Sequence, residues 1–319
     1  MRETVKLFFA TDLHGSTRCF RKFVNAGRFF EADILIMGGD MCGKALVPVV
    51  EAASGQFEFK LAGTAQSVEK EDLAHLSETL VDQGYYPYIT TPDELRSLQG
   101  DPAAVSALFS RLMVERAAEW VQLASERLRD SGIVCFLSPG NDDEFAIDDV
   151  LAGAEPVVVN PDGRIVELPL GWSMISVGYS NRTPWNTPRE VDDAELGAMI
   201  NGLVESTSPD LRHTIFNFHL PPAGTAIDQA PKLDETLKPV VKGGHAQWTD
   251  AGSRAVREAI ERYQPQLSLH GHIHESRGAI KLGKTLCVNP GSEYGEGVLR
   301  GALFQLDRKS LRSHLLTMG

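Results

Sequence analysis

The sequence contains few cysteines, and none of them is placed for a zinc site or a disulfide framework. There are four, Cys19, Cys42, Cys135 and Cys287, and no pair has the close spacing of zinc ligands. A chain of 319 residues can bury a substantial core without covalent cross-links. Because Cys135 and Cys287 lie in apolar, strand-like runs, we expect free thiols packed in the interior.

Long hydrophobic runs are also absent. The longest, such as LFFA and DILIMGG, have the length of strands and fall well short of the roughly 20 residues of a membrane-spanning helix. The N-terminal residues lead directly into an expected strand and lack the apolar stretch of a signal peptide. We therefore expect a cytoplasmic protein that has no membrane partner.

Basic residues are scarce. The chain has 31 lysines and arginines against 43 aspartates and glutamates, which gives a net charge of −12. Binding to duplex nucleic acid usually requires a basic surface that displaces counterions from the phosphates. No basic stripe is visible, so we expect a small substrate and no duplex nucleic acid. A local metal-rich site can still attract phosphate in such an acidic protein.

The sequence does contain a series of apolar runs separated by helical segments. Runs at 5–10, 33–40 and 133–142 are apolar throughout, and helical patterns lie between them. This arrangement indicates a sheet that is covered on both faces. Strands return from residue 157 onwards, and we predict an α/β fold with one domain over residues 1–319.

Between residues 43 and 100 the alternation of strands and helices stops. We expect the segment 43–100 to be an insertion that forms a small lid or subdomain. Its aromatic loop carries Tyr85, Tyr86 and Tyr88. These tyrosines supply the core of the insertion, form a contact in a homodimer, or stack on a substrate base.

Polar side chains follow five of the apolar runs, at the point where each run ends. They are Asp12, His14, Asp40, Asn141, His219, His272 and His274. In an open α/β fold the carboxyl ends of the strands form the ligand crevice. We therefore expect four imidazoles, two carboxylates and an amide to converge there.

The types and spacing of these residues favour transition metals. Asp12 and His14 are two residues apart, as are His272 and His274, so each pair shares a face if the strand geometry continues. Oxygen and nitrogen ligands without thiolate suit Mn, Fe, Co or Zn. Seven ligands are too many for one four-coordinate ion and suit two ions that share a carboxylate. Such a pair can lower the pKa of a bridging water and hold a phosphoryl group.

The ordered motifs DLHG, GGD, GND, FH and GHIH, which span residues 12 to 274, resemble those of the calcineurin-like metallophosphoesterase family. The resemblance implies a four-layer α-β-β-α sandwich of two mixed sheets and two divalent transition metal ions, with Mn, Fe and Zn as candidates. It implies hydrolysis by a hydroxide that bridges the ions. One ion is assigned to Asp12, His14 and His274, the other to Asn141, His219 and His272, with Asp40 bridging.

In many members of this family a histidine follows the asparagine ligand and protonates the leaving oxygen or stabilises the transition state. Here that position is Asp142, so the chain resembles the phosphodiesterase-like members in which the histidine is replaced. An ionised carboxylate repels phosphate, and only a raised pKa lets it donate a proton. Asp143 matches the acidic residue that usually comes next. Asp40, Asp142 and Asp143 are therefore our candidate catalytic residues.

Candidates for contact with the substrate follow a strand in the segment SNRTPWNTPRE (180–190). Asn181, Arg182 and Trp185 are the candidates, because a guanidinium binds phosphate oxygens well and tryptophan can stack on a base. The alternative is a surface loop in which Thr187 and Glu190 begin a helix, as a capping box does.

Three functions remain open. The first is a metal-dependent phosphodiesterase for a cyclic nucleotide or similar diester, because leaving groups of lower pKa need less protonation. The second is a phosphomonoesterase in which another residue supplies the proton, such as His245 in the loop KGGHAQW, our remaining candidate for substrate contact. The third is a non-catalytic binding scaffold, against which the complete ligand set argues. We favour the phosphodiesterase.

Overall fold

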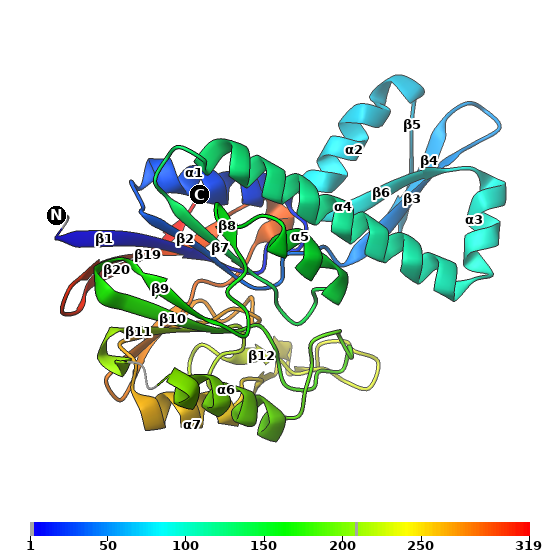
Figure 1. The fold of residues 1–319 in the computed structure, drawn as a ribbon. Helices are drawn as coiled ribbons and strands as arrows, with labels where there is room; N and C mark the ends of the chain where they lie inside the picture. The colour runs from blue at the N-terminus through cyan, green and yellow to red at the C-terminus, as the bar shows by residue number, and fades with distance from the viewer. Residues whose placement is uncertain (1–2, 208–209) are drawn as a thin grey trace.

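The computed structural model describes residues 3–207 and 210–319, and two six-stranded sheets form its centre (Figure 1). The strands of the first sheet are β1 (Thr4–Ala10), β2 (Ile34–Gly38), β7 (Val134–Ser138), β8 (Val158–Val159), β19 (Arg300–Asp307) and β20 (Leu311–Met318). Their order is β20-β19-β1-β2-β7-β8. The pairings from β1 to β8 are parallel, whereas β19 and β20 are antiparallel to their neighbours, so the sheet is mixed.

The second sheet has the same mixed character. Its strands are β9 (Ile165–Leu168), β10 (Trp172–Val177), β11 (Thr214–Phe218), β16 (Leu267–Leu269), β17 (Gly278–Leu282) and β18 (Thr285–Asn289). Their order is β17-β18-β16-β11-β10-β9. The four inner strands pair in parallel, and the two edge strands are antiparallel.

The two sheets pack face to face and carry helices on their outer faces. Because side chains alternate along a strand, Leu7 and Phe9 of β1 face the second sheet, while Phe8 faces the helices. The helices α1 (Thr17–Phe29), α4 (Pro102–Leu128) and α5 (Asp148–Ala152) cover the first sheet, and α6 (Asp193–Thr207) and α7 (Arg254–Tyr263) cover the second (Figure 1). The predicted four-layer α-β-β-α sandwich is confirmed.

A separate four-stranded sheet lies to one side of the sandwich (Figure 1). It contains β3 (Ala45–Glu51), β4 (Phe57–Leu61), β5 (Thr64–Val68) and β6 (Tyr85–Thr90), with α2 (Leu73–Asp82) and α3 (Pro92–Gln99). Val49, Phe57 and Leu80 belong to its own hydrophobic cluster. We call residues 45–99 the small subdomain; it lies within the segment expected to be an insertion, and its role as a lid stays a prediction.

The long segment between β11 and α7 forms two short hairpin-like pairs. They are β12 (Gln229–Pro231) with β15 (Trp248–Asp250), and β13 (Val241–Lys242) with β14 (His245–Ala246). All four cysteines are buried free thiols, as expected. Within the described ranges, no helix has both the length and the apolar character needed to cross a membrane.

The helix expected to begin at Thr187 is absent, and that prediction is wrong. The backbone amide of Thr187 donates to the Glu190 carboxylate at 3.0 Å, which is one half of a capping box. The Thr187 hydroxyl donates to the same carboxylate at 2.7 Å, whereas in a capping box it would accept from the amide of residue 190. The same carboxylate also accepts a 2.9 Å hydrogen bond from the amide of Thr183. The interactions therefore close an irregular loop, and the helix α6 begins later, at Asp193.

Candidate metal centre

The seven predicted ligands come from the loops that follow β1, β2, β7, β11 and β16. These are inner, parallel strands of the two sheets, so their carboxyl ends meet at one edge of the sandwich. The structure brings the seven side chains together there. Five of them are buried, His272 is partly buried, and His274 retains 24% of its side-chain exposure.

The first group of donors contains Asp12, His14 and His274. The Nε2 atoms of His14 and His274 are 3.0 Å apart, and Asp12 Oδ1 lies 3.4 Å from His274 Nε2. Asp12 Oδ1 lies 4.0 Å from His14 Nε2. Three electron-rich atoms thus face a common point, which is an arrangement that suits a cation.

The second group contains Asp40, His219 and His272, and the side chain of Asn141 joins it. Asn141 Oδ1 lies 3.1 Å from His219 Nε2 and 2.7 Å from His272 Nδ1. Asp40 Oδ1 lies 3.4 Å from His219 Nε2. The group therefore offers two oxygen and two nitrogen atoms.

Asp40 lies between the two groups. Its Oδ2 atom is 3.6 Å from His14 Nε2 in the first group, while its Oδ1 atom faces His219 in the second. Its two oxygens are thus directed at different groups, the position that a bridging carboxylate requires.

The residues fit the divalent transition ions that the motifs imply. Their donors are carboxylate, imidazole and amide atoms without thiolate, the set that Mn, Fe and Zn accept. Burial alone raises the pKa of Asp40, but the charge of His219 and a hydrogen bond from it hold that pKa well below its usual value. Conversely, burial opposes a charge on His219, and Asp40 outweighs burial and raises the pKa of His219 to about 10.

The backbone aims these side chains differently from the sequence-based expectation. Strand geometry does not continue through the ligand pairs, because Asp12, His14, Asp40 and His272 have positive φ angles of 55°, 40°, 52° and 66°. Aspartate and histidine enter this left-handed region more readily than most residues do. Each still costs on the order of 1–3 kcal/mol, a strain that is typical of functional sites.

Two glycines of the motifs permit the close approach of these loops. A Cβ atom on Gly140 would lie 2.3 Å from Asp40 Oδ1, and one on Gly271 would lie 2.4 Å from Asp12 Oδ2. Both distances are far below van der Waals contact. The glycines of GND and GHIH are therefore needed for packing against the central carboxylates.

Hydrogen bonds from the ligands to the backbone fix the orientation of two imidazoles. His219 Nδ1 lies 3.0 Å from the carbonyl oxygen of Gly38, and His14 Nδ1 lies 3.3 Å from that of Cys42. A carbonyl acceptor at Nδ1 holds the proton there and leaves Nε2 free to bind an ion.

Asp143 joins the loop after β2, which carries Asp40, to the loop after β7, which carries Asn141; these are the second and third metal loops. Its carboxylate accepts hydrogen bonds from the backbone amides of Met41 at 2.9 Å, Cys42 at 2.7 Å and Gly140 at 2.7 Å. The residue is fully buried. Both oxygens are used in this way, so Asp143 holds the two loops together, and a catalytic role for it stays a prediction.

Asp142, at the position of the family histidine, forms an ion pair with Lys44. Asp142 Oδ2 lies 2.8 Å from Lys44 Nζ and 3.7 Å from His14 Nδ1. Burial and the charge of Asp40 raise the pKa of Asp142 to about 6, against the opposite effect of Lys44. Burial disfavours charge on Lys44 as well, but Asp142 and Asp40 outweigh it and raise the pKa of the ammonium.

Sequence reasoning missed Lys44. It lies four positions after Asp40 in the segment GGDMCGK, where it resembled an ordinary surface lysine. No local pattern marks its role, because its partner Asp142 lies far along the chain.

The predicted substrate residues make their hydrogen bonds and ion pairs with residues other than the metal donors. Asn181 donates to the carbonyl of Gly252 at 3.4 Å, and Arg182 forms an ion pair with Asp192 at 3.2 Å. Trp185 is 60% exposed, and His245 is exposed on β14. In the described part of the chain, no hydrogen bond or ion pair connects any of the four to the metal donors, so their contact with substrate stays a prediction.

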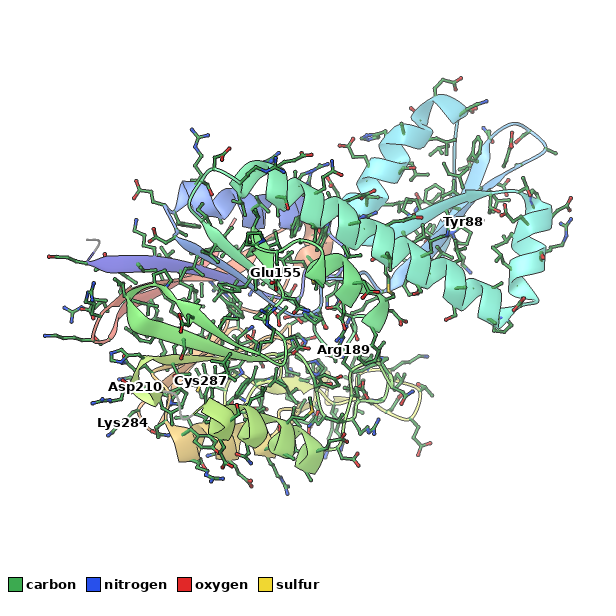
Figure 2. All side chains as sticks on the ribbon, viewed as in Figure 1. Tyr88, Glu155, Arg189, Asp210, Lys284 and Cys287 are labelled. Atoms are coloured by element: carbon green, nitrogen blue, oxygen red, sulfur yellow. The ribbon has the colours of Figure 1, made fainter. Side chains whose placement is uncertain are left out.

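The segment 180–190 reaches the centre through other residues. Asn141 Nδ2 donates to the hydroxyl of Thr187 at 2.9 Å. Arg189 is buried, donates to the carbonyl of Asp143 at 2.8 Å and pairs with Asp148 at 2.7 Å. Figure 2 shows Arg189 between the two halves of the sandwich. This arginine supports the third metal loop instead of facing an incoming phosphate.

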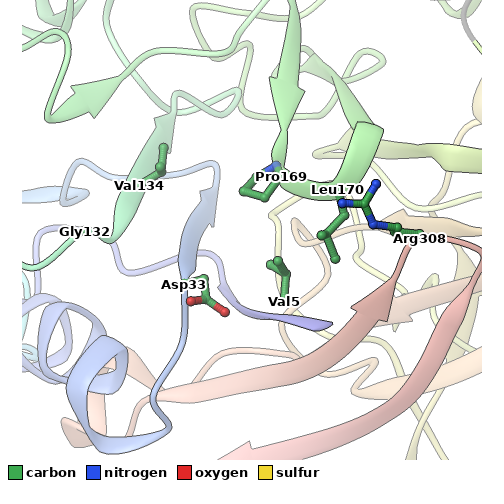
Figure 3. A pocket seen from close by; sticks show the side chains of 7 residues that line it. All are labelled: Val5, Asp33, Gly132, Val134, Pro169, Leu170 and Arg308. Atoms are coloured by element: carbon green, nitrogen blue, oxygen red, sulfur yellow. The ribbon is translucent and has the colours of Figure 1, made fainter. Parts of the chain in front are cut away.

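A small pocket of about 220 Å³ lies elsewhere (Figure 3). It is lined by Val5, Asp33, Gly132, Val134, Pro169, Leu170 and Arg308. Most of these residues lie at the beginnings of strands, whereas the metal donors follow strand ends. The pocket is thus at the opposite edge of the sheets and takes no part in the centre.

Comparisons with known proteins add little beyond the fold. No known family profile matches the sequence. The curated protein MJ1162 of Methanocaldococcus jannaschii, which is uncharacterized, is 29% identical over 154 residues, or 48% of this chain and 61% of that protein. The chain therefore matches only about three-fifths of the length of that relative.

Two solved structures align with nearly the whole chain. TT1561 of Thermus thermophilus is 15% identical, with a TM-score of 0.53 and coverage of 99% of this chain and 98% of that one. A second structure is 17% identical with a TM-score of 0.57 and the same coverage. YfcE, a phosphoesterase from E. coli, has 13% identity, 98% coverage of both chains and a TM-score of only 0.33. The two higher scores support the fold alone, the four-layer sandwich of two mixed sheets.

Proposed function

We propose that the protein is a phosphoesterase that works with two divalent transition metal ions, and that its substrate is a small phosphodiester such as a cyclic nucleotide. The observation that carries the proposal is the position of Asp40 between two groups of metal donors. Asp12, His14 and His274 would hold one ion, and Asn141, His219 and His272 the other, with Asp40 shared. Mn, Fe and Zn are the candidate ions.

When bound, the two ions would supply Lewis acidity towards the phosphoryl oxygens and lower the pKa of water between them. The residues of the chain have the tasks of holding and orienting. Carbonyl acceptors fix His14 and His219, and the Asp143 carboxylate fixes the loops that carry Asp40 and Asn141. This preorganisation avoids rearrangement when substrate binds.

Two features favour a diester over a monoester. A diester carries one negative charge, whereas a monoester carries up to two near neutral pH and is repelled more strongly by Asp142 and Asp40. The protein also has no histidine at position 142 to protonate a poor leaving group. A diester with a leaving group of low pKa needs the least help of this kind.

The direct test is hydrolysis of bis-p-nitrophenyl phosphate and p-nitrophenyl phosphate by protein loaded with Mn²⁺, together with elemental analysis of the metal content. We expect two ions per chain and faster hydrolysis of the diester. Faster hydrolysis of the monoester would favour a phosphomonoesterase. A protein without tightly held metal and without activity would be a binding scaffold instead.

Asp40→Asn tests the shared carboxylate in the same assays. We expect loss of activity and of at least one ion, because an amide is a neutral and weaker metal ligand than a carboxylate. Asp93→Asn, at an exposed site on α3, is the matched control and should change neither quantity.

A further inference from the structure

Lys44 brings a positively charged side chain to the edge of the metal centre. Among the ion pairs of the described residues, the one that joins a lysine or arginine to a carboxylate beside the metal donors is Lys44 with Asp142, at 2.8 Å. The side chain of Lys44 is 49% exposed, whereas Asp12, His14 and Asp40 are buried. Its ammonium thus lies between the buried donors and the solvent from which a substrate arrives.

Four carboxylates gather at the centre, those of Asp12, Asp40, Asp142 and Asp143. The ions of the proposed function would balance the donors Asp12 and Asp40, whereas Lys44 balances Asp142. An ammonium has three donors. One of them serves Asp142, and the half-exposed position leaves the others available to a phosphoryl oxygen, for which lysine is a well-suited point charge.

The backbone that carries Lys44 is held firmly against the first metal loop. The amide of Gly43 donates to the hydroxyl of Tyr86 on β6 at 3.0 Å. A Cβ atom on Gly43 would lie 2.0 Å from the carbonyl oxygen of Gly84, and one on Gly84 would lie 2.2 Å from that of His14. The backbones at His14, Gly43 and Gly84 are therefore packed so tightly that a side chain does not fit between them.

Arg116 of α4 contacts both sides of this contact between the His14 loop and the small subdomain. Its guanidinium donates to the carbonyl of Gly15 at 2.9 Å and lies 5.3 Å from the centre of the Tyr86 ring. Lys44 immediately precedes β3, the first strand of the small subdomain. The docking of the small subdomain on the His14 loop thus sets the position of the ammonium.

We propose that Lys44 binds the phosphoryl group of the substrate, in the role that a histidine after the asparagine ligand has in related motifs. Asp142 is then a positioning residue that directs the ammonium, and the small subdomain is the element that delivers it. The inference rests on the proposed phosphoesterase function and identifies a part of its substrate site.

A simpler role for Lys44 is to neutralise Asp142. The double variant Lys44→Met/Asp142→Asn separates the two roles, because it removes both charges and keeps similar side-chain volumes. If Lys44 only neutralises Asp142, the double variant regains the properties of the wild type. If Lys44 binds phosphate, the double variant stays defective.

The experiment measures binding of inorganic phosphate to Mn²⁺-loaded protein by calorimetry, with metal content and diester hydrolysis in parallel. We expect Lys44→Met and the double variant to bind phosphate about tenfold to a hundredfold more weakly, the loss typical of a charge-assisted hydrogen bond. Lys44→Arg should retain part of the affinity, since it keeps the charge. Lys60→Met, at an exposed site on β4 of the same subdomain, is the control.

Two results would overturn the inference: wild-type phosphate affinity in the double variant, or a loss of metal in Lys44→Met that by itself accounts for weaker phosphate binding. Absence of diester hydrolysis in the wild type would remove the proposed function instead, and the binding measurements would still test Lys44. Circular dichroism and thermal unfolding verify that each variant folds.

Discussion

The side-chain amide of Asn141 donates a 2.9 Å hydrogen bond to the hydroxyl of Thr187. The same nitrogen donates to Asp142 Oδ1 at 3.1 Å, and the two bonds together leave Oδ1 directed at His219 and His272. An amide oxygen can bind a metal, whereas an amide nitrogen cannot. Thr187, on a loop far along the chain, thus controls the orientation of a metal donor.

Thr187→Val should weaken binding of the ion in the second group. The variant keeps the shape of the side chain but removes the acceptor, and loss of such an outer contact typically costs about tenfold to a hundredfold in metal affinity. Competition with a chelator of known affinity measures the change. Thr187→Ser retains the hydroxyl and should behave as the wild type; equal affinities for the valine and serine variants would contradict the role of the hydrogen bond.

Gly140→Ala should disrupt the centre. The added Cβ atom would lie 2.3 Å from both the backbone nitrogen and Oδ1 of Asp40, so the loop that carries the shared carboxylate must move. A displacement of about 1 Å commonly lowers turnover by about a hundredfold, and diester hydrolysis measures it. The control is Gly202→Ala in α6, where the new methyl group meets no atom within 4 Å; a Gly140 variant as active as this control would show that the approach is not critical.

Asp143→Asn should destabilise the protein. Three backbone amides donate to the carboxylate, and an amide side chain provides one acceptor oxygen without charge. We expect a loss of about 2 kcal/mol in the free energy of unfolding, the size typical of a buried hydrogen bond to a charged group. Urea unfolding of metal-free protein measures it, with exposed Asp130→Asn as the control; coinciding unfolding curves would refute the structural role.

The cysteines should resist thiol reagents in the native protein. All four are buried, and burial raises the pKa of Cys135 and of Cys287 to about 12. Since the thiolate is the reactive form, a raised pKa means protonated, unreactive thiols at pH 8. A colorimetric disulfide reagent should therefore detect no thiol before denaturation and four afterwards. Rapid reaction of the folded protein would contradict the burial.

The class of fold was predictable because the strands are apolar throughout. Runs such as the one ending in Ala10 are buried on both faces, which is the pattern of a sheet between two layers. The donors were recognisable for a related reason. Asp40 and Asn141 are polar residues that directly follow apolar strands, where a buried carboxylate or amide needs a partner.

Other features were not readable from the sequence. Thr187 and Glu190 have the spacing of a capping box, yet their hydrogen bonds close a loop, because a local sequence pattern does not specify the backbone that follows. The pairing of Lys44 with Asp142 joins residues that are far apart in the chain. The parallel pairing of β2 with β7 and the hydrogen bonds of Asp143 bring their loops together.

The sequence by itself determined an α/β fold and the polar residues that gather at the strand ends, because apolar runs and their ends are local properties of the chain; the four-layer sandwich followed from the resemblance of its motifs. The tertiary structure alone decided how the donors are aimed, since left-handed backbone conformations at Asp12 and Asp40 replace the alternation of a strand. The tertiary structure also decided which charged side chains form ion pairs, such as Lys44 with Asp142. Contacts between distant segments depend on how the layers and loops pack, and no local pattern encodes that packing.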